Sequence, residues 1–421
     1  MSARAATMSS YQRFVLALLA FLQFTVVLDF AIMAPLGAQL MPALHVTPRQ
    51  FSLAVSAYAF SAATSGLLAA SVADRFDRKR FLLFFYGGFV LGTLLCGLAR
   101  TYEMLLVARV VTGLFGGVIG SVVSTITTDL FPLDMRGRVM GVVQTAFAAS
   151  RVLGIPAGLY FTHRWDWHAP FIGIVVAALL VGAVIVLRLR PITQHLDASA
   201  PKRAPLAQLK TTLTTTRYLP AFGTTALLTT GGFMLMPFGS AYAVHSIGID
   251  LEDLPLVYFV AGACSLVTGP WVARIADRAG QFPVFVGGVV VAIAFVLLYS
   301  QLGMTALPLF ILVNSLMFVA LGATMIPSQA LITAVPSADG RGAFMSVSAS
   351  IQQMSGGIAS VVAGLVVSEA TDGHIVRFDR LGYVVACTSL VALVLMSRVR
   401  RLVEEGGTRT RSASVLKKAK S

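Results

Sequence analysis

About a dozen apolar stretches, each long enough to cross a lipid bilayer as a helix, dominate the sequence. A membrane-spanning helix needs roughly 20 mostly apolar residues, and short polar breaks divide this chain into segments of about that length. Hydrophobic residues make up 57% of the chain and charged residues only 12%, which is too few charges to cover the surface of a soluble protein. We therefore predict an all-α membrane protein with twelve transmembrane helices. The predicted spans are 14–41, 51–73, 81–99, 103–128, 139–162, 169–190, 218–246, 253–276, 282–302, 305–331, 343–368 and 381–399.

The basic residues are distributed unequally between the two sides of the predicted membrane. With the N-terminus placed inside, 25 of the 32 Lys and Arg fall in inner loops and tails and five in outer loops. Because Lys and Arg are enriched in cytoplasmic loops, both termini are expected in the cytoplasm, and the protein is expected in the inner membrane of the cell. The net charge of +14 then reflects topology, so no nucleic-acid partner is expected. The apolar run 14–28 continues past Asp29 without a cleavage-site pattern, which favours an uncleaved first helix.

The two halves of the sequence carry similar short motifs in the same order. Three pairs recur at separations of 203 to 206 positions: VADRFDR (72–78) with IADRAGQ (275–281), RGRVMG (136–141) with RGAFMS (341–346), and AGLYF (157–161) with AGLVV (363–367).

Two parallel six-helix halves around a central site are a recurrent plan among transporters. The predicted organisation is an N-terminal half at 1–190, a cytoplasmic linker at 191–217, a C-terminal half at 218–400 and a basic cytoplasmic tail at 401–421.

Several motifs resemble those of the major facilitator superfamily of membrane transporters. The stretch ASVADRFDRKR (70–80) is similar to the superfamily's loop signature G-x-L-A-D-R-x-G-R-K, although Ala70 and Asp77 stand where glycine is preferred. RVVTGLFGG (109–117) is similar to the R-x-x-x-G signature of helix 4, and GIPAG (154–158) is a weakened form of the Gly-Pro-rich signature of exporters. The first hairpin resembles the drug:proton antiporter and sugar-efflux branch. The resemblance spans nearly the whole chain and implies two pseudo-symmetric six-helix halves in a secondary transporter that works as a monomer.

The charge cluster after the second predicted helix is interpreted as a conformational latch, the role that this loop has in the superfamily. Asp74 ends that helix at the cytoplasmic face, near the expected start of the eleventh helix. A carboxylate is favourable at a helix N-terminus, so docking there would hold the inner side closed. Simple anchoring of the helix ends by the cations is the alternative. The candidate gating residues are Asp74, Arg75, Arg78, Lys79, Asp277 and Arg278.

Asp29, about midway along the first predicted span, is the candidate proton carrier. Charges inside a bilayer cost on the order of 2.5–3.5 kcal/mol each on insertion scales and are usually functional. Antiporters of the resembling branch use an acid on helix 1 to load and release a proton as access alternates. Arg109, on the fourth predicted span, is expected close to Asp29 as its partner in a proton relay. An ordinary ion pair between helices is the alternative.

Arg151 is the other arginine that falls well inside a predicted span, away from its ends, and the corresponding position of the second half, near Gly357, carries no charge. A buried guanidinium with no obvious second carboxylate is expected either to bind a substrate anion or to pair with Asp29. Polar side chains of other spans are candidates for a cavity wall, with helix–helix hydrogen bonds as the alternative. The candidate substrate-binding residues are Arg151, Gln144, Asn314, Gln329 and Gln353.

Together these features predict a transporter that exports a small molecule, such as a drug, sugar or metabolite, in exchange for protons. The expected partners are that substrate, the proton and the lipid bilayer. A proton-coupled uptake symporter is the alternative within transport, and a membrane sensor or scaffold that does not transport is the alternative outside it. No enzyme is expected, since the sequence has no phosphate-cradling G-x-x-x-x-G-K-[ST] motif. No cofactor or metal is expected either.

Overall fold

A computed structural model describes residues 8–72, 76–193, 211–336, 341–370 and 374–419. Within these ranges, 12 helices are long and apolar enough to cross a membrane, which confirms the predicted fold class. They are Ser10–Ile32, Pro48–Leu68, Arg78–Gly97, Tyr102–Leu130, Met135–Arg164, Ala169–Arg188, Thr216–Ile247, Leu251–Ala279, Gln281–Ser300, Leu307–Thr333, Arg341–Val366 and Phe378–Glu405.

Several spans are built from more than one helical element. The first half contains α1 (Ser10–Ile32), α2 (Gly37–Ala43), α3 (Pro48–Val72), α4 (Arg78–Gly97), α5 (Tyr102–Leu130), α6 (Leu133–Ala149), the π-helical turn η2 (Ser150–Gly154), α7 (Ile155–Arg164) and α8 (Ala169–Arg188). The second half contains the turn η3 (Thr216–Tyr218), α10 (Leu219–Leu235), η4 (Met236–Phe238), α11 (Gly239–Tyr242), the π-helical turn η5 (Ala243–Ile247), η6 (Leu251–Asp253), α12 (Leu254–Ala279), α13 (Gln281–Ser300), α14 (Leu307–Thr333), α15 (Arg341–Val366) and α16 (Phe378–Ala419), with a short hairpin of β1 (Ser368–Glu369) and β2 (Ile375–Val376).

The first span differs from its prediction. A single helix over 14–41 was wrong, because α1 ends at Ile32 and a turn precedes the short helix α2. The turn contains Pro35, whose backbone has no N–H to donate to a preceding helical carbonyl. The break lies beside Asp29, in the last turn of α1.

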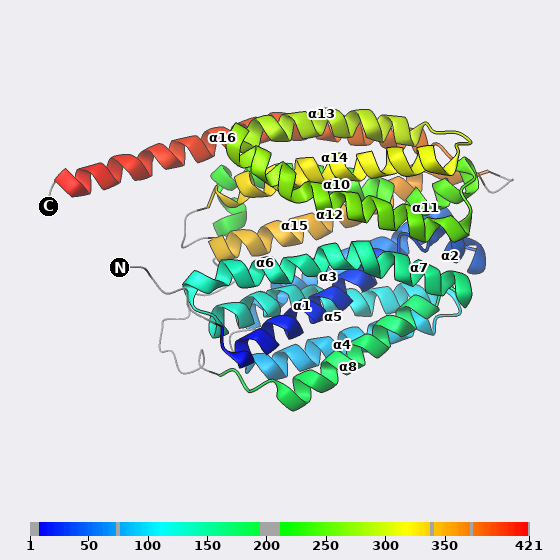
Figure 1. Cartoon of the computed structure of the whole chain (residues 1–421), viewed down its shortest axis with the longest axis horizontal. Coiled ribbons are helices and arrows are strands. Elements are labelled where there is room, and N and C mark those ends of the chain that lie inside the picture. The colour runs from blue at the N-terminus through cyan, green and yellow to red at the C-terminus, as the bar shows by residue number, and fades with distance from the viewer. Residues whose placement is uncertain (1–7, 73–75, 194–210, 337–340, 371–373, 420–421) are drawn as a thin grey trace.

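The two halves repeat one packing pattern. In the first half, α5 packs against α3 and α4, α8 packs against α4 and α1, and α1 packs against α6. The equivalent pairs of the second half also pack together: α14 with α12 and α13, α16 with α13 and α10, and α10 with α15. Figure 1 shows the helices of both halves lying along the long axis, and α1 begins at the same end of the bundle at which α16 ends.

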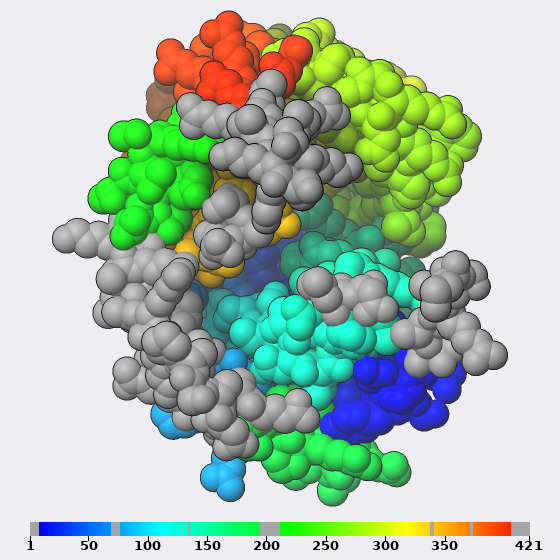
Figure 2. Space-filling model, turned by 90° about the vertical axis from the view of Figure 1, so that its left-hand side faces the viewer, coloured from blue at the N-terminus to red at the C-terminus, as the bar shows by residue number. Residues whose placement is uncertain are grey.

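The halves contact each other mainly through α3 with α15 and through α12 with η2 and α7. At the end of the bundle away from the termini, Ser240 Oγ donates a hydrogen bond to Ala34 O at 3.0 Å, and the rings of Phe51 and Phe238 lie 6.3 Å apart. Figure 2 looks onto the opposite end, where the surface is hollowed between the two halves. The structure is therefore closed at one end and open at the end that carries the termini.

Close packing of α5 on α3 depends on two glycines. A Cβ atom at Gly113 would lie 2.5 Å from the carbonyl oxygen of Tyr58, and one at Gly117 would collide with Ala62. Small residues let membrane helices approach closely in this way. The contact sets Arg109, one turn before Gly113, over the ring of Tyr58.

Candidate functional site

The centre of the first half contains a buried ion pair. Asp29 of α1 and Arg109 of α5 are both 0% exposed, and Arg109 Nη1 donates to Asp29 Oδ2 at 3.1 Å. The same Nη1 lies 3.5 Å from the backbone oxygen of Asp29. The structure thus brings together the two residues that sequence analysis selected as proton-coupling candidates.

Two further helices complete the surroundings of this pair. Thr93 Oγ1 of α4 donates to Asp29 Oδ1 at 3.0 Å, so each carboxylate oxygen accepts one hydrogen bond. The guanidinium carbon of Arg109 lies 4.7 Å from the centroid of the Tyr58 ring on α3, a cation–π contact. Four helices therefore meet at Asp29 and Arg109.

Sequence analysis did not identify Thr93. Its only signal is its place on the buried face of α4, with Tyr86, Phe89 and Cys96 at helical spacing. Threonines are frequent on the spans, and most hydroxyls bond a carbonyl one turn earlier, as Thr112 does with Ala108 O. The role of Thr93 becomes visible only when α1 and α4 are placed together.

Part of the hydrogen-bonding capacity of Arg109 is unused. Its Nε and Nη2 atoms are buried and have no hydrogen-bond partner within the described ranges. Arginine binds a carboxylate most strongly through two parallel hydrogen bonds, whereas here only Nη1 reaches the Asp29 carboxylate. The pair is therefore held by fewer contacts than its two groups can make, which leaves donors for a rearranged state.

Arg151 is placed differently from its prediction. Its side chain is exposed to solvent in this structure and does not pair with Asp29, whose guanidinium partner is Arg109. Arg151 lies in the π-helical turn η2, in which each backbone hydrogen bond spans five residues rather than the four of an α-helix. Its neighbour Ser150 packs on α1 instead, where its Oγ lies 3.0 Å from Phe24 O.

The remaining candidate substrate residues lie in different surroundings. Gln144 and Gln329 are exposed and Gln353 is half-buried. Asn314 is 4% exposed and borders a small cavity of about 10 Å³ between α11, α12, α13 and α14. This volume holds the centre of about one water molecule.

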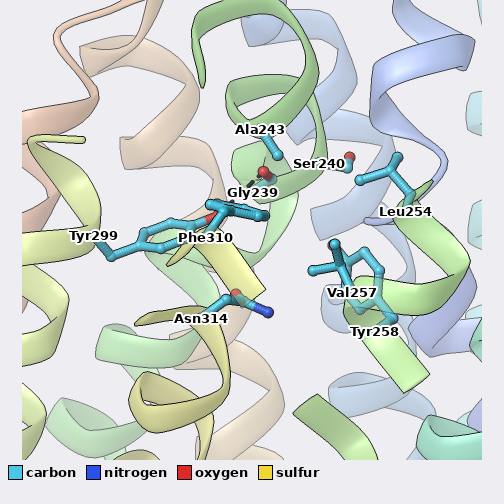
Figure 3. A pocket seen from close by; sticks show the side chains of 9 residues that line it. All are labelled: Gly239, Ser240, Ala243, Leu254, Val257, Tyr258, Tyr299, Phe310 and Asn314. Atoms are coloured by element: carbon cyan, nitrogen blue, oxygen red, sulfur yellow. Dashed lines mark hydrogen bonds between the residues drawn. The ribbon is translucent and has the colours of Figure 1, made fainter. Parts of the chain in front are cut away.

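Figure 3 shows this cavity, with Asn314 on one side and Tyr258 and Val257 of α12 facing it. The hydroxyl of Tyr299 donates to Gly239 O at 3.3 Å along its wall. Asn314 therefore belongs to a small, mostly apolar pocket of the second half, apart from the ion pair of the first.

Two of the candidate gating residues make contacts inside the first half. Arg78 is 3% exposed, and its Nε lies 3.1 Å from Asp129 Oδ2 at the end of α5. Lys79 Nζ donates to the backbone oxygen of Val186 on α8 at 2.9 Å. These contacts fasten the start of α4 to its neighbours.

Of the other gating candidates, Asp277 and Arg278 show no contact between the halves within the described residues. Asp74 and Arg75 lie outside the described residues. Asp277 is exposed and accepts a hydrogen bond from Gln281 Nε2 at 3.2 Å, and Arg278 is exposed.

Curated proteins with similar sequences include transporters of two kinds. A vacuolar membrane amino acid uptake transporter, fnx2 of Schizosaccharomyces pombe, is 35% identical over 29% of this chain and 21% of its own length. Multidrug resistance protein 3 of Bacillus subtilis is 36% identical over 27% of this chain and 22% of its own length. The chain thus spans about a fifth of the length of these two relatives. The MFS-type transporter YceJ of Bacillus subtilis, of uncharacterised function, is 25% identical over 63% of this chain and 67% of its own length.

Solved structures of transporters share the fold. The D-xylose–proton symporter superposes with a TM-score of 0.74 at 14% identity, covering 92% of this chain and 97% of its own. A bacterial homologue of the human lysosomal transporter Spinster, in an inward-facing and occupied conformation, superposes with a TM-score of 0.70 at 16% identity, covering 96% of this chain and 98% of its own.

The model of one family covers nearly the whole chain. The Major Facilitator Superfamily model matches residues 19–360 and 221–418. The match includes both halves of the fold and the helices that hold Asp29 and Arg109. The chain belongs to the Major Facilitator Superfamily of transporters.

Proposed function

We propose that this protein exports a small molecule across the inner membrane in exchange for protons, by alternating access, with Asp29 as the proton carrier and Arg109 as its partner. The observation that carries the proposal is a fully buried carboxylate held by one arginine contact and one hydroxyl, in a chain of a transporter family. Ionisable groups inside a membrane protein commonly belong to proton relays or ion pathways.

The geometry suggests how a proton can bias the two access states. The negative charge on Asp29 attracts Arg109 and so helps to hold α1 against α5. A proton on Asp29 removes that attraction and frees the guanidinium, which already has two unused donors. A ligand shifts a conformational equilibrium only through different affinities for its two states. Exchange follows when the proton and the cargo favour opposite states.

The remaining residues have proposed roles in cargo binding and gating. Arg151, Gln144, Asn314, Gln329 and Gln353 are proposed to contact cargo. The loop with Asp74, Arg75, Arg78 and Lys79, together with Asp277 and Arg278, is proposed to control closure at the end that carries the termini, which we assign to the cytoplasm. The resemblance to Multidrug resistance protein 3 supports export, whereas fnx2, an uptake transporter, supports the symport alternative.

The sign of the driving gradient distinguishes these alternatives. Purified protein is reconstituted in liposomes with an acidic or an alkaline lumen, and pooled drugs, sugars and amino acids are supplied outside. Mass spectrometry then identifies which compounds accumulate. An antiporter concentrates its cargo in the acidic lumen, because protons leave as cargo enters, whichever way the protein is inserted. A symporter concentrates cargo in the alkaline lumen.

Two controls make the result specific to the proton carrier. Asp29→Asn is expected to abolish accumulation, whereas Asp166→Asn, which removes an exposed acid between α7 and α8, is expected to retain it. Accumulation in the alkaline lumen would show that the protein is a symporter and would contradict the export proposal. Accumulation that does not depend on the pH gradient would contradict proton coupling.

A further inference from the structure

Arg151 is an exposed cation without a partner among the described residues. No hydrogen bond or ion pair joins its side chain to any residue of the ranges that the structure describes. It lies near the middle of the span Met135–Arg164, far in sequence from both ends of that helix. A long side chain at a helix end can reach the membrane surface, but one at mid-span has no such route. The charge therefore needs water or a counter-ion inside the protein.

The helix that carries Arg151 exposes two different faces. One face is apolar and includes Val142, Leu153 and Tyr160, which are exposed. The other includes Gln144, Phe147 and Arg151, which are also exposed and follow one another at i, i+3 and i+7. In an α-helix, residues at these spacings share one side, and Arg151 follows at the start of the π-helical turn η2, where the winding begins to widen.

Packing partners decide which of the two faces meets lipid. Between them, one edge of the helix packs on α1 through Ser150 and Gly154, and the other packs on α12 through Val152, which meets Gly262. A helix flanked on both edges has one face toward the bilayer and one toward the space between the halves. The apolar face suits lipid, and the face with Gln144 and Arg151 suits the space between the two halves.

The described part of the chain offers no free acid to neutralise Arg151 near the middle of its span. In the twelve spans, every Asp and Glu, Asp29 included, lies within three residues of an end. Asp29 itself is fully buried, and its two oxygens are taken by Arg109 and Thr93. A fixed positive charge that faces the space between the halves would therefore have no compensating acid among the described residues.

We propose that the cargo of this transporter is a small amphiphilic organic anion whose carboxylate, phosphate or sulfonate group binds the guanidinium of Arg151. The planar fork of arginine matches all three of these groups. Phe147, one turn away on the same face, offers an apolar contact for the body of the cargo, and Gln144 offers an amide. The inference rests on the proposed transport function and adds the chemical class of the cargo.

Two permanently charged probes with the same aromatic body test this proposal. Naphthalene-2-sulfonate is the anion and (2-naphthylmethyl)trimethylammonium is the cation; both are fluorescent and cross protein-free membranes slowly. Their entry into proteoliposomes is followed for wild type, Arg151→Lys, Arg151→Gln and Arg151→Glu. Arg164→Gln, which removes an exposed cation from the outer end of the same helix, is the matched control.

The wild type is expected to transport the sulfonate and not the ammonium probe. Arg151→Gln is expected to slow sulfonate entry by about tenfold or more, since a tenfold change is a modest loss for one charged contact. Arg151→Lys keeps the charge without the planar fork and is expected to lose less than Arg151→Gln. Arg164→Gln is expected to retain most of the sulfonate entry, and Arg151→Glu is expected to favour the ammonium probe. A wild type that moves neither probe, prefers the cation, or keeps its rate in Arg151→Gln overturns the inference.

Failure of this inference and failure of proton coupling give different results. If Asp29→Asn abolishes gradient-driven accumulation of some pooled compound while Arg151→Gln leaves it intact, the transport function stands and the anion site is wrong. If sulfonate entry depends on Arg151 but does not depend on the pH gradient, the proposed anion site is supported and the proposed proton coupling is wrong.

Discussion

Asp29 and Arg109 meet through a single guanidinium–carboxylate contact of 3.1 Å, with both side chains at 0% exposure. Burying two charges costs several kcal/mol per ion, and their attraction offsets this only when further hydrogen bonds satisfy both groups. Thr93 satisfies one carboxylate oxygen, but two nitrogens of Arg109 stay without partners in the described structure. An ion pair whose hydrogen-bonding groups are only partly satisfied is better suited to a contact that breaks and re-forms than to a permanent structural contact.

Removal of Arg109 is expected to destabilise the folded protein strongly. Arg109→Gln leaves the Asp29 carboxylate buried without its cation, which costs about 3–5 kcal/mol. Thermal unfolding in detergent measures the loss. The double variant Asp29→Asn/Arg109→Gln is expected to lose much less than the sum of the two single variants. Strictly additive losses would show that the two charges do not interact.

The hydroxyl of Thr93 is expected to stabilise the protein through Asp29 alone. Thr93→Val keeps the volume but removes the donor to Oδ1, which is expected to cost about 1–3 kcal/mol. Thr93→Ser keeps a hydroxyl and serves as the control. In an Asp29→Asn background the cost of Thr93→Val should shrink, because the charged acceptor is gone. An equal loss in both backgrounds would assign the effect to packing.

Substitution by alanine is expected to destabilise the protein at one glycine of α5 and not at another. Gly113→Ala places a Cβ atom 2.5 Å from Tyr58 O and forces α3 and α5 apart, at a cost of about 1–3 kcal/mol. Gly120→Ala meets no atom within 4 Å and is expected to be neutral or slightly stabilising. The difference in melting temperature between the two variants measures the effect. Equal melting temperatures would contradict the close contact of these helices.

The contact between the halves at Gly357 predicts a conformational effect. A Cβ atom there would lie 2.6 Å from the ring of Phe60, so Gly357→Leu is expected to open the end away from the termini. Gly342→Leu is the control, since a Cβ atom at Gly342 meets nothing within 4 Å. Ala38→Cys, in a chain without Cys96, Cys264 and Cys387, reports the opening, because Ala38 is buried in the closed state.

Labelling of that cysteine by a hydrophilic maleimide is expected to rise about tenfold in Gly357→Leu, the result of a moderate population shift. The control is expected to label as slowly as the parent. Slow labelling in both variants would mean that this contact does not hold the halves closed.

The fold was predictable because a bilayer demands long apolar helices, and these are visible in composition alone. The ion pair was predictable in part, since two charges inside one half of a membrane protein tend to find each other. The break at Pro35 and the π-helical turn at Ser150–Gly154 were not predicted. The turn shifts which residues face α1, so helical periodicity through Arg151 did not reveal its exposure. Thr93 was missed because its partner comes from another helix.

The most direct test of the account compares two kinds of transport by the same variant. Cargo identified in the gradient assay is measured with wild type and Asp29→Asn, first for accumulation driven by a pH gradient and then for exchange between labelled and unlabelled cargo without a gradient. The account predicts that Asp29→Asn keeps exchange, because the cargo site remains, and loses accumulation, because the proton has no carrier. Wild-type accumulation in Asp29→Asn would contradict the central claim and place the proton site elsewhere.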